Sequence, residues 1–168
     1  MKRPQASLLL CIAIMPWLTS CAVKRWTHPP GATVPVTMKA GNSGGGVLSA
    51  VNAYRSSKGK SPLQREAQLD ALALQHSAYM MRHRSKHLVS HDGYQGRVRE
   101  AQQKFGYRGL SENVGASSSK GAVQDIVGFW TGSRPHRSSI LGQWDATGIG
   151  VVVDSDGMVF VTQVFGRR

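Results

Sequence analysis

Two histidines and a carboxylate from separate parts of the chain have the residue types of a metal site. His91 lies in a Ser-His-Asp-Gly segment, Glu112 in Ser-Glu-Asn-Val-Gly, and His136 near a proline further on. Neutral imidazole is a good zinc ligand, and two imidazoles with one carboxylate and an open position form the ligand set of several catalytic zinc sites. Glu112 would act there as a third ligand or by accepting the N–H of one imidazole ring. These residues predict a site for a divalent cation such as zinc.

Ser133 offers a second chemistry, nucleophilic hydrolysis. It precedes His136 by three residues, and with Glu112 as the orienting acid the three side chains have the types of a hydrolytic triad. No Gly-x-Ser-x-Gly elbow surrounds Ser133, which argues against this reading. Pro135 is expected to end a helix near Ser133 and to place His136 at a bend. A hydrolase or peptidase is therefore kept as the alternative hypothesis.

A competing histidine cluster comes earlier in the chain. His83, His87 and His91 stand four residues apart and would share one face if a single helix ran through all three. Histidines at that spacing can chelate zinc. The basic residues within 82–86 oppose a divalent cation there, and no glutamate follows His83 as the zinc-peptidase motif requires. We expect His83 to be a partly buried helix residue.

Hydrophobic spacing predicts the elements that must position these side chains. Apolar residues recur at steps of three and four over residues 47–55, 69–83 and 123–130, which indicates three helices. Residues 149–153 and 159–165 have strand character on either side of a turn, which predicts an antiparallel hairpin. Helices followed by a terminal hairpin indicate an α+β fold in which helices cover a small antiparallel sheet.

The first residues have the pattern of an export signal. A basic start precedes an apolar stretch over residues 6–18, which is too short to span a bilayer comfortably, and Leu-Thr-Ser-Cys follows it. This close resembles the lipobox of bacterial lipoproteins, in which Cys21 becomes the acylated first residue of the mature chain. We therefore expect residues 1–20 to be a lipoprotein signal peptide, with an ordinary signal peptide or an uncleaved anchor as alternatives. Ala22 favours an outer-membrane destination if the cell is Gram-negative.

The rest of the chain divides into a tether and one domain. Residues 21–46 are rich in Pro, Gly, Thr and Ser without periodicity, which predicts a flexible tether, and residues 47–168 have the length of one domain. Only Cys11 and Cys21 are present, so the domain has no disulfide available. Its stability must come from packing.

The chain is strongly basic, with a net charge of +12. Removal of the signal peptide takes Lys2 and Arg3 with it, which leaves 19 basic against 9 acidic side chains, a net charge of +10. This balance suits an anionic envelope lipid or a cell-wall polymer, or it is a solvated surface that aids solubility. Nucleic acid is not expected, because an exported protein rarely meets it and no nucleic-acid-binding motif is present.

A series of short motifs follows one order along residues 47–166. Its residues are Asn52, Tyr54 and Arg55, Pro62 and Leu63, residues 69–78, Met80, His91, Arg97, Gly106 and Tyr107, the segment 111–115, Trp130, Ser133, His136, Arg137, Ile140 and Leu141, Gly148 and Gly150, and the segment 162–166. In this order the motifs resemble the bacterial branch of the CAP superfamily, named for cysteine-rich secretory proteins, antigen 5 and pathogenesis-related 1, and also called the SCP domain. The resemblance covers residues 47–166.

The resemblance implies a three-layer α-β-α sandwich whose open cleft holds two histidines and two glutamates. His91 matches the first histidine, Glu112 one glutamate and His136 the second histidine. Ser133 stands at the place of the second glutamate, and a hydroxyl has neither the charge nor the metal affinity of a carboxylate. Other branches of the superfamily imply sterol and lipid binding, and peptidase activity has been proposed for some members.

Together these observations predict an exported, membrane-anchored lipoprotein that is a binding module and not an enzyme. Its cleft would hold a divalent cation through His91, Glu112 and His136 and an envelope ligand, either a lipid or a cell-wall component. The membrane would be its partner through lipidated Cys21. The alternatives are a hydrolase that uses Ser133, His136 and Glu112, and a structural envelope domain with a vestigial cleft.

Overall fold

The computed structural model of the chain describes residues 43–168. The predicted signal peptide, Cys21 and residues 21–42 of the predicted tether lie outside the described residues. The elements are α1 (Ser43–Ser57), β1 (Gln64–Arg65), α2 (Ala67–His83), α3 (Tyr94–Phe105), β2 (Gly109–Ser117), α4 (Ala122–Gly132), α5 (Arg134–Leu141), β3 (Ala146–Val153) and β4 (Val159–Arg167).

The three predicted helices and the hairpin are confirmed as α1, α2, α4 and the β3–β4 pair. The domain begins earlier than expected, because α1 starts at Ser43 and includes residues 43–46, which the sequence assigned to the tether. Gly44 is buried there beside the side chain of Arg65, whereas Gly45 and Gly46 are exposed. Within residues 43–168, no helix combines the length and the apolar character that a membrane span requires.

The four strands form one sheet in the order β1-β3-β4-β2. Strands β2 and β3 both pair antiparallel with β4, whereas β1 runs parallel to β3. The expected antiparallel sheet is therefore present in β2, β3 and β4, and the short parallel strand β1 makes the whole sheet mixed. The parallel strand β1 has only two residues, Gln64 and Arg65, which is too short for any alternation of apolar and polar residues to appear in the sequence.

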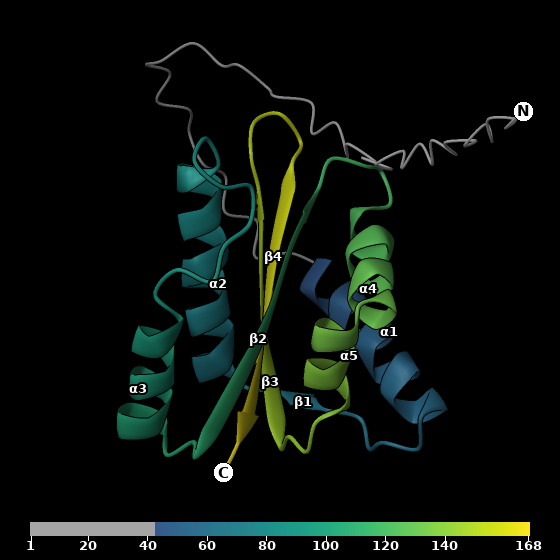
Figure 1. The fold of residues 1–168 in the computed structure, drawn as a ribbon, viewed down its shortest axis with the longest axis vertical. Helices are drawn as coiled ribbons and strands as arrows, with labels where there is room; N and C mark the ends of the chain where they lie inside the picture. The colour runs from purple at the N-terminus through teal and green to yellow at the C-terminus, as the bar shows by residue number, and fades with distance from the viewer. Residues whose placement is uncertain (1–42) are drawn as a thin grey trace, which may run out of the picture. The chain divides into compact units, whose positions relative to one another are not determined.

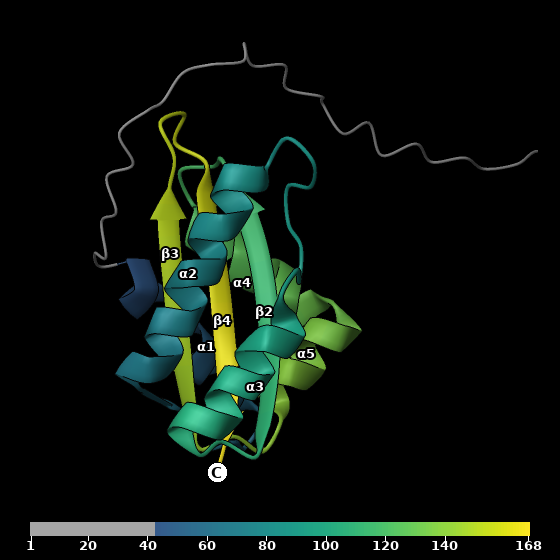
Figure 2. The same ribbon diagram turned by 90° about the vertical axis from the view of Figure 1, so that its left-hand side faces the viewer.

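The expected three-layer sandwich is confirmed. Figure 1 shows α2 and α3 on one face of the sheet and α1, α4 and α5 on the other, and Figure 2 shows α2 and α3 in front of the strands. Adjacent strand residues point to opposite faces, so Phe165 of β4 packs with Trp130 of α4 while Val164 packs with Leu69 of α2. Both faces of the sheet are thereby buried.

Two glycines of β3 allow α2 to lie directly on the sheet. A Cβ atom at Gly148 would overlap the backbone of Leu69 and Asp70, and one at Gly150 would overlap the backbone of Ala73 and Leu74. Only a residue without a side chain permits this approach. The close contact sets the position of α2 and of the side chains it carries toward the site.

Candidate functional site

The centre of the site is a buried ion pair between strand β2 and helix α3. Glu112 of β2 points to the sheet face that α2 and α3 cover, and its side chain is almost fully buried. Arg97 of α3 donates from Nε to Oε2 and from Nη2 to Oε1, each over 2.7 Å. Two parallel bonds of this kind hold a carboxylate more firmly than a single contact does. Arg97 also donates to the backbone carbonyl of Asp92, over 2.9 Å, and so ties the start of α3 to the pair.

His91 joins this pair from the loop before α3. Its Nδ1–H donates to Oε1 of Glu112 over 2.9 Å, while 51% of its side chain remains exposed. Glu112 therefore orients the His91 ring, which was one of the two roles expected for this carboxylate. The guanidinium of Arg97 occupies the two carboxylate oxygens and repels a cation, so Glu112 is poorly suited to be a metal ligand itself.

The neighbouring charges keep Glu112 ionised. Burial opposes its charge, but the hydrogen bonds from His91 and Arg97 and the positive charge of Arg97 outweigh this effect and lower the pKa of Glu112. Buried His76 of α2 lies on the same side, with Nε2 3.8 Å from Oε1 of Glu112. Burial lowers the pKa of His76 despite the attraction of Glu112, and its Nε2–H donates to the carbonyl of Ser90 over 2.7 Å.

The second histidine is held from the opposite face of the sheet. Helix α4 ends at Gly132, Ser133 is extended, and α5 begins at Arg134 with Pro135 in its first turn. The predicted helix end near Ser133 is confirmed, but the bend is at Ser133 and His136 lies within α5. His136 Nδ1 and Ser133 Oγ are 2.9 Å apart and hydrogen-bonded. Asn113 Nδ2 donates to the backbone carbonyl of His136 over 3.1 Å.

The surroundings of His136 change its pKa. Burial and the positive charge of His91 both lower the pKa of His136. The exposed ring of Phe129 lies beside His136, with 5.3 Å between the ring centroids. Adjacent residues of β2 thus contact the two histidines. Glu112 accepts a hydrogen bond from the ring of His91, and Asn113 donates one to the backbone of His136.

This arrangement bears differently on the two expected chemistries. Ser133 contacts His136, but the Glu112 carboxylate contacts His91, Arg97 and, at longer range, His76. Among the described residues no Ser133–His136–Glu112 relay is therefore assembled. Over residues 43–168 no cluster of three or more metal-ligating side chains is found. Glu112 orients one of the two imidazoles that were expected to ligate a divalent cation, and the predicted metal site stays a prediction.

The competing cluster of His83, His87 and His91 does not form one helix face, because α2 ends at His83. His83 donates from Nδ1 to the carbonyl of Tyr79 and stacks on its ring, with 4.0 Å between the centroids. Its expected role as a partly buried helix residue is confirmed.

Sequence reasoning missed the partner of Glu112. Arg97 was noticed only as part of a resemblance, although a glutamate inside a buried strand requires a compensating charge. The chain offers many arginines and lysines, and spacing alone does not select one of them. Tyr94 was also missed; its hydroxyl donates to the carbonyl of Leu110 over 2.6 Å and so joins the start of α3 to β2.

Comparison with known proteins supports the fold and the family. The model of the cysteine-rich secretory protein family, CAP, matches residues 48–165. An outer surface protein of Borrelia burgdorferi is 16% identical with a TM-score of 0.62, and the match covers 73% of this chain and 90% of that one. A search among curated proteins found no match.

Two further structures are longer than this chain. An extracellular SCP-domain protein of Bacillus anthracis is 27% identical with a TM-score of 0.61, and the match covers 75% of this chain and 40% of that one. A cysteine-rich secretory protein of Staphylococcus aureus is 22% identical with a TM-score of 0.58, and the match covers 76% and 38%. The chain spans less than half the length of these two proteins.

Proposed function

The chain belongs to the CAP family of cysteine-rich secretory proteins, and we propose that it is a non-enzymatic binding module whose site lies between His91 and His136. The observation that carries this proposal is the Arg97–Glu112 pair. It engages both oxygens of the carboxylate on which metal-dependent and triad chemistry would rely. The groups left to contact a ligand are the imidazoles of His91 and His136, the hydroxyl of Ser133 and the ring of Phe129.

The surroundings of the imidazoles favour an envelope ligand with an apolar part, such as a lipid or a cell-wall component. Phe129 leaves 63% of its surface exposed beside His136, and exposed aromatic rings commonly supply contact area in binding sites. His136 is biased toward its neutral form by burial and by the charge of His91, which lower its pKa. A neutral ring can donate or accept a hydrogen bond, and it can also ligate a divalent cation such as zinc.

Titration of the chain from Ala22 onward tests the proposal with two probes, zinc ion and soluble cell-wall muropeptides. We expect at least one probe to bind, and the variant His91→Ala with His136→Ala to lose that binding. The matched control His83→Ala with His87→Ala removes two histidines elsewhere and should leave binding unchanged. No binding of either probe, or equal binding by the double variant of the site, contradicts the proposed binding module.

Hydrolysis remains a second candidate because of the 2.9 Å contact between Ser133 and His136. We expect no turnover of ester or peptide substrates. Turnover that Ser133→Ala abolishes would establish the hydrolase instead. If the variants of His91, His136 and Ser133 stay folded and change neither ligand binding nor turnover, the structural envelope domain is the better description.

We also propose that the protein is exported and anchored through Cys21. Export is supported by the likeness to an extracellular protein that is 27% identical, and anchoring by the lipobox-like close of the leader. Membrane partition of the protein in cells should be lost in the variant Cys21→Ser. Partition that survives this substitution contradicts lipidation.

A further inference from the structure

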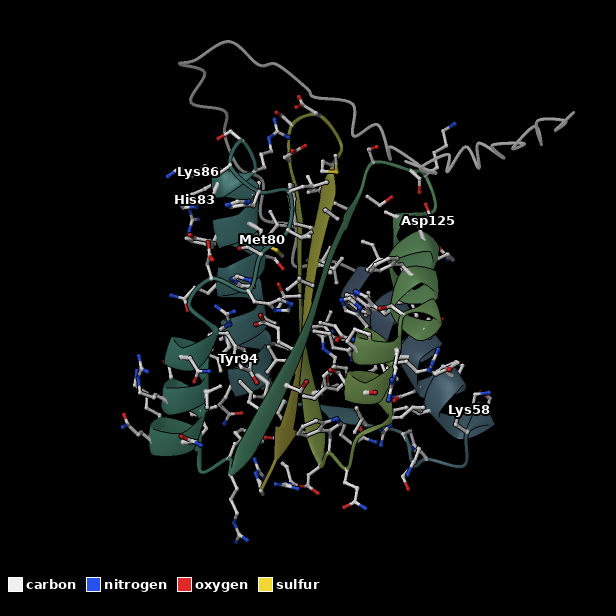
Figure 3. All side chains as sticks on the ribbon, viewed as in Figure 1. Lys58, Met80, His83, Lys86, Tyr94 and Asp125 are labelled. Atoms are coloured by element: carbon white, nitrogen blue, oxygen red, sulfur yellow. The ribbon has the colours of Figure 1, made fainter. Side chains whose placement is uncertain are left out.

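The last turn of α2 and the loop that follows it expose basic and apolar side chains together. We call this stretch, residues 82–89, the 82–89 loop. Arg82, Lys86 and His87 are exposed in it, and the chain turns after the helix through a hydrogen bond from the Lys86 N–H to the His83 carbonyl, over 2.9 Å. Leu88 and Val89 are 45% and 42% exposed. Figure 3 places Lys86 and His83 at one end of the described domain, at the end of α2.

The acidic residues around the 82–89 loop already have partners. Arg84 forms ion pairs with Asp154 and Asp156 of the β3–β4 turn. Asp92 accepts a hydrogen bond from the hydroxyl of Tyr79 over 3.0 Å. By contrast, no ion pair within residues 43–168 involves Arg82 or Lys86. Their charges are therefore available to an anionic partner.

The combination of residue types selects the class of partner. A single exposed apolar side chain is ordinary on a protein surface, but Leu88 and Val89 are adjacent and follow Lys86 within three residues. A soluble polyanion would attract the cations without burying the two apolar side chains. An anionic bilayer binds both the cationic and the apolar side chains, because its headgroups attract lysine and arginine while its interface takes up apolar side chains.

We propose that the 82–89 loop docks on the surface of an anionic lipid bilayer. Leu88 and Val89 enter the headgroup region, and Arg82 and Lys86 contact lipid phosphates. Docking orients the domain and brings His91, two residues beyond Val89, close to the membrane. The proposal does not depend on the ligand of the His91–His136 site or on lipidation of Cys21.

Vesicle cosedimentation tests this docking with the chain from Ala22 onward, which lacks the acyl anchor and keeps the whole described core. We expect binding to phosphatidylglycerol-containing vesicles and little binding to pure phosphatidylcholine. Arg82→Gln with Lys86→Gln should weaken binding about 30-fold. Leu88→Ser with Val89→Ser should weaken it about tenfold, because apolar burial at the interface is lost.

The matched control is Lys58→Gln with Lys60→Gln, which removes the same charge. Lys58 lies at the opposite end of the described domain from Lys86 (Figure 3). Lys58 and Lys60 are both exposed. Binding by this control should stay within about twofold, since charges beyond a Debye length from the membrane are screened. Circular dichroism confirms that each variant is folded.

Three results would overturn the proposal. The first is absence of binding to anionic vesicles. The second is an equal loss in the Lys58 and Lys60 control, which would indicate a diffuse charge effect. The third is vesicle binding that depends on Arg82 and Lys86 but not on Leu88 and Val89, which would indicate attraction by charge alone, without entry of the apolar side chains into the headgroup region. Loss of zinc or muropeptide binding in the His91 and His136 variant has no bearing on these outcomes.

Discussion

Replacement of Arg97 by methionine should destabilise the protein strongly. Methionine keeps most of the volume of the side chain but removes two of the three hydrogen bonds that the Glu112 carboxylate accepts from His91 and Arg97. Each bond to a charged group contributes about 1.5 kcal/mol, so the loss sums to about 3 kcal/mol. Removing one partner of a buried pair costs roughly 3–5 kcal/mol. Because His91 still holds one oxygen of Glu112, we expect the lower end of that range.

The pH dependence of this effect has a defined sign. Since the pKa of Glu112 is lowered in the folded protein, the ionised carboxylate stabilises the fold above its ordinary pKa, and this contribution is lost as the pH falls through the lowered value. In Arg97→Met the Glu112 carboxylate has lost the guanidinium and can take up a proton instead. The difference in stability between wild type and variant should therefore narrow in acid.

Urea unfolding at neutral and acidic pH measures both effects, and a double-mutant cycle isolates the pair. Arg97→Met combined with Glu112→Gln should recover part of the lost stability, because no uncompensated charge remains buried; we expect a coupling of about 2 kcal/mol. If the two substitutions add within about 0.5 kcal/mol, the reasoning from a buried, coupled pair is refuted.

Three further outcomes follow from the packing and the charges. Gly148→Ala should lower the free energy of unfolding by about 1–3 kcal/mol or more, because the added Cβ would overlap the backbone of α2. The control Gly128→Ala in α4, where an added Cβ has no neighbour within 4 Å, should leave the protein equally stable or more stable in the same thermal melt. Buried Arg55 donates to two carbonyls at the end of α5, so Arg55→Met should cost about 2 kcal/mol in urea unfolding and weaken ligand binding through His136; unchanged stability would contradict this anchoring. In NMR titrations His136 should show a pKa below the ordinary imidazole value, and His91→Ala should raise it; an unchanged pKa would mean that the two rings do not interact.

The helix α2 and the β3–β4 hairpin were predictable because burial imposes a strong apolar period on them. Helix α3 was not, since residues 94–105 are mostly polar and bury chiefly Arg97 and Ala101. Strand β2 was also missed, because its Ser-Glu-Asn-Val-Gly sequence has the composition of a loop. It is a strand because β4 pairs with it along its whole length. Tertiary pairing of this kind leaves little trace in local sequence.

The candidate site was predictable to a similar extent. Resemblance singled out His91, Glu112 and His136, and the structure joins the first two by a hydrogen bond. The resemblance did not reveal that Arg97 forms an ion pair with the Glu112 carboxylate, nor that Asn113 connects β2 to His136. Both contacts depend on which face of β2 each residue occupies, and that is set by the register with β4, not by spacing along the chain.

The position of β2 at the edge of the sheet also determines when the site can form. Glu112 and Asn113, which hold the two histidines, face Val164 and Gln163 of β4 directly, and β2 has no other neighbour in the sheet. During synthesis, about fifty further residues must therefore be added after this segment before its pairing strand exists. Until β4 has been made, His91 and His136 belong to separate stretches of chain, and a nascent or truncated protein lacks the site altogether.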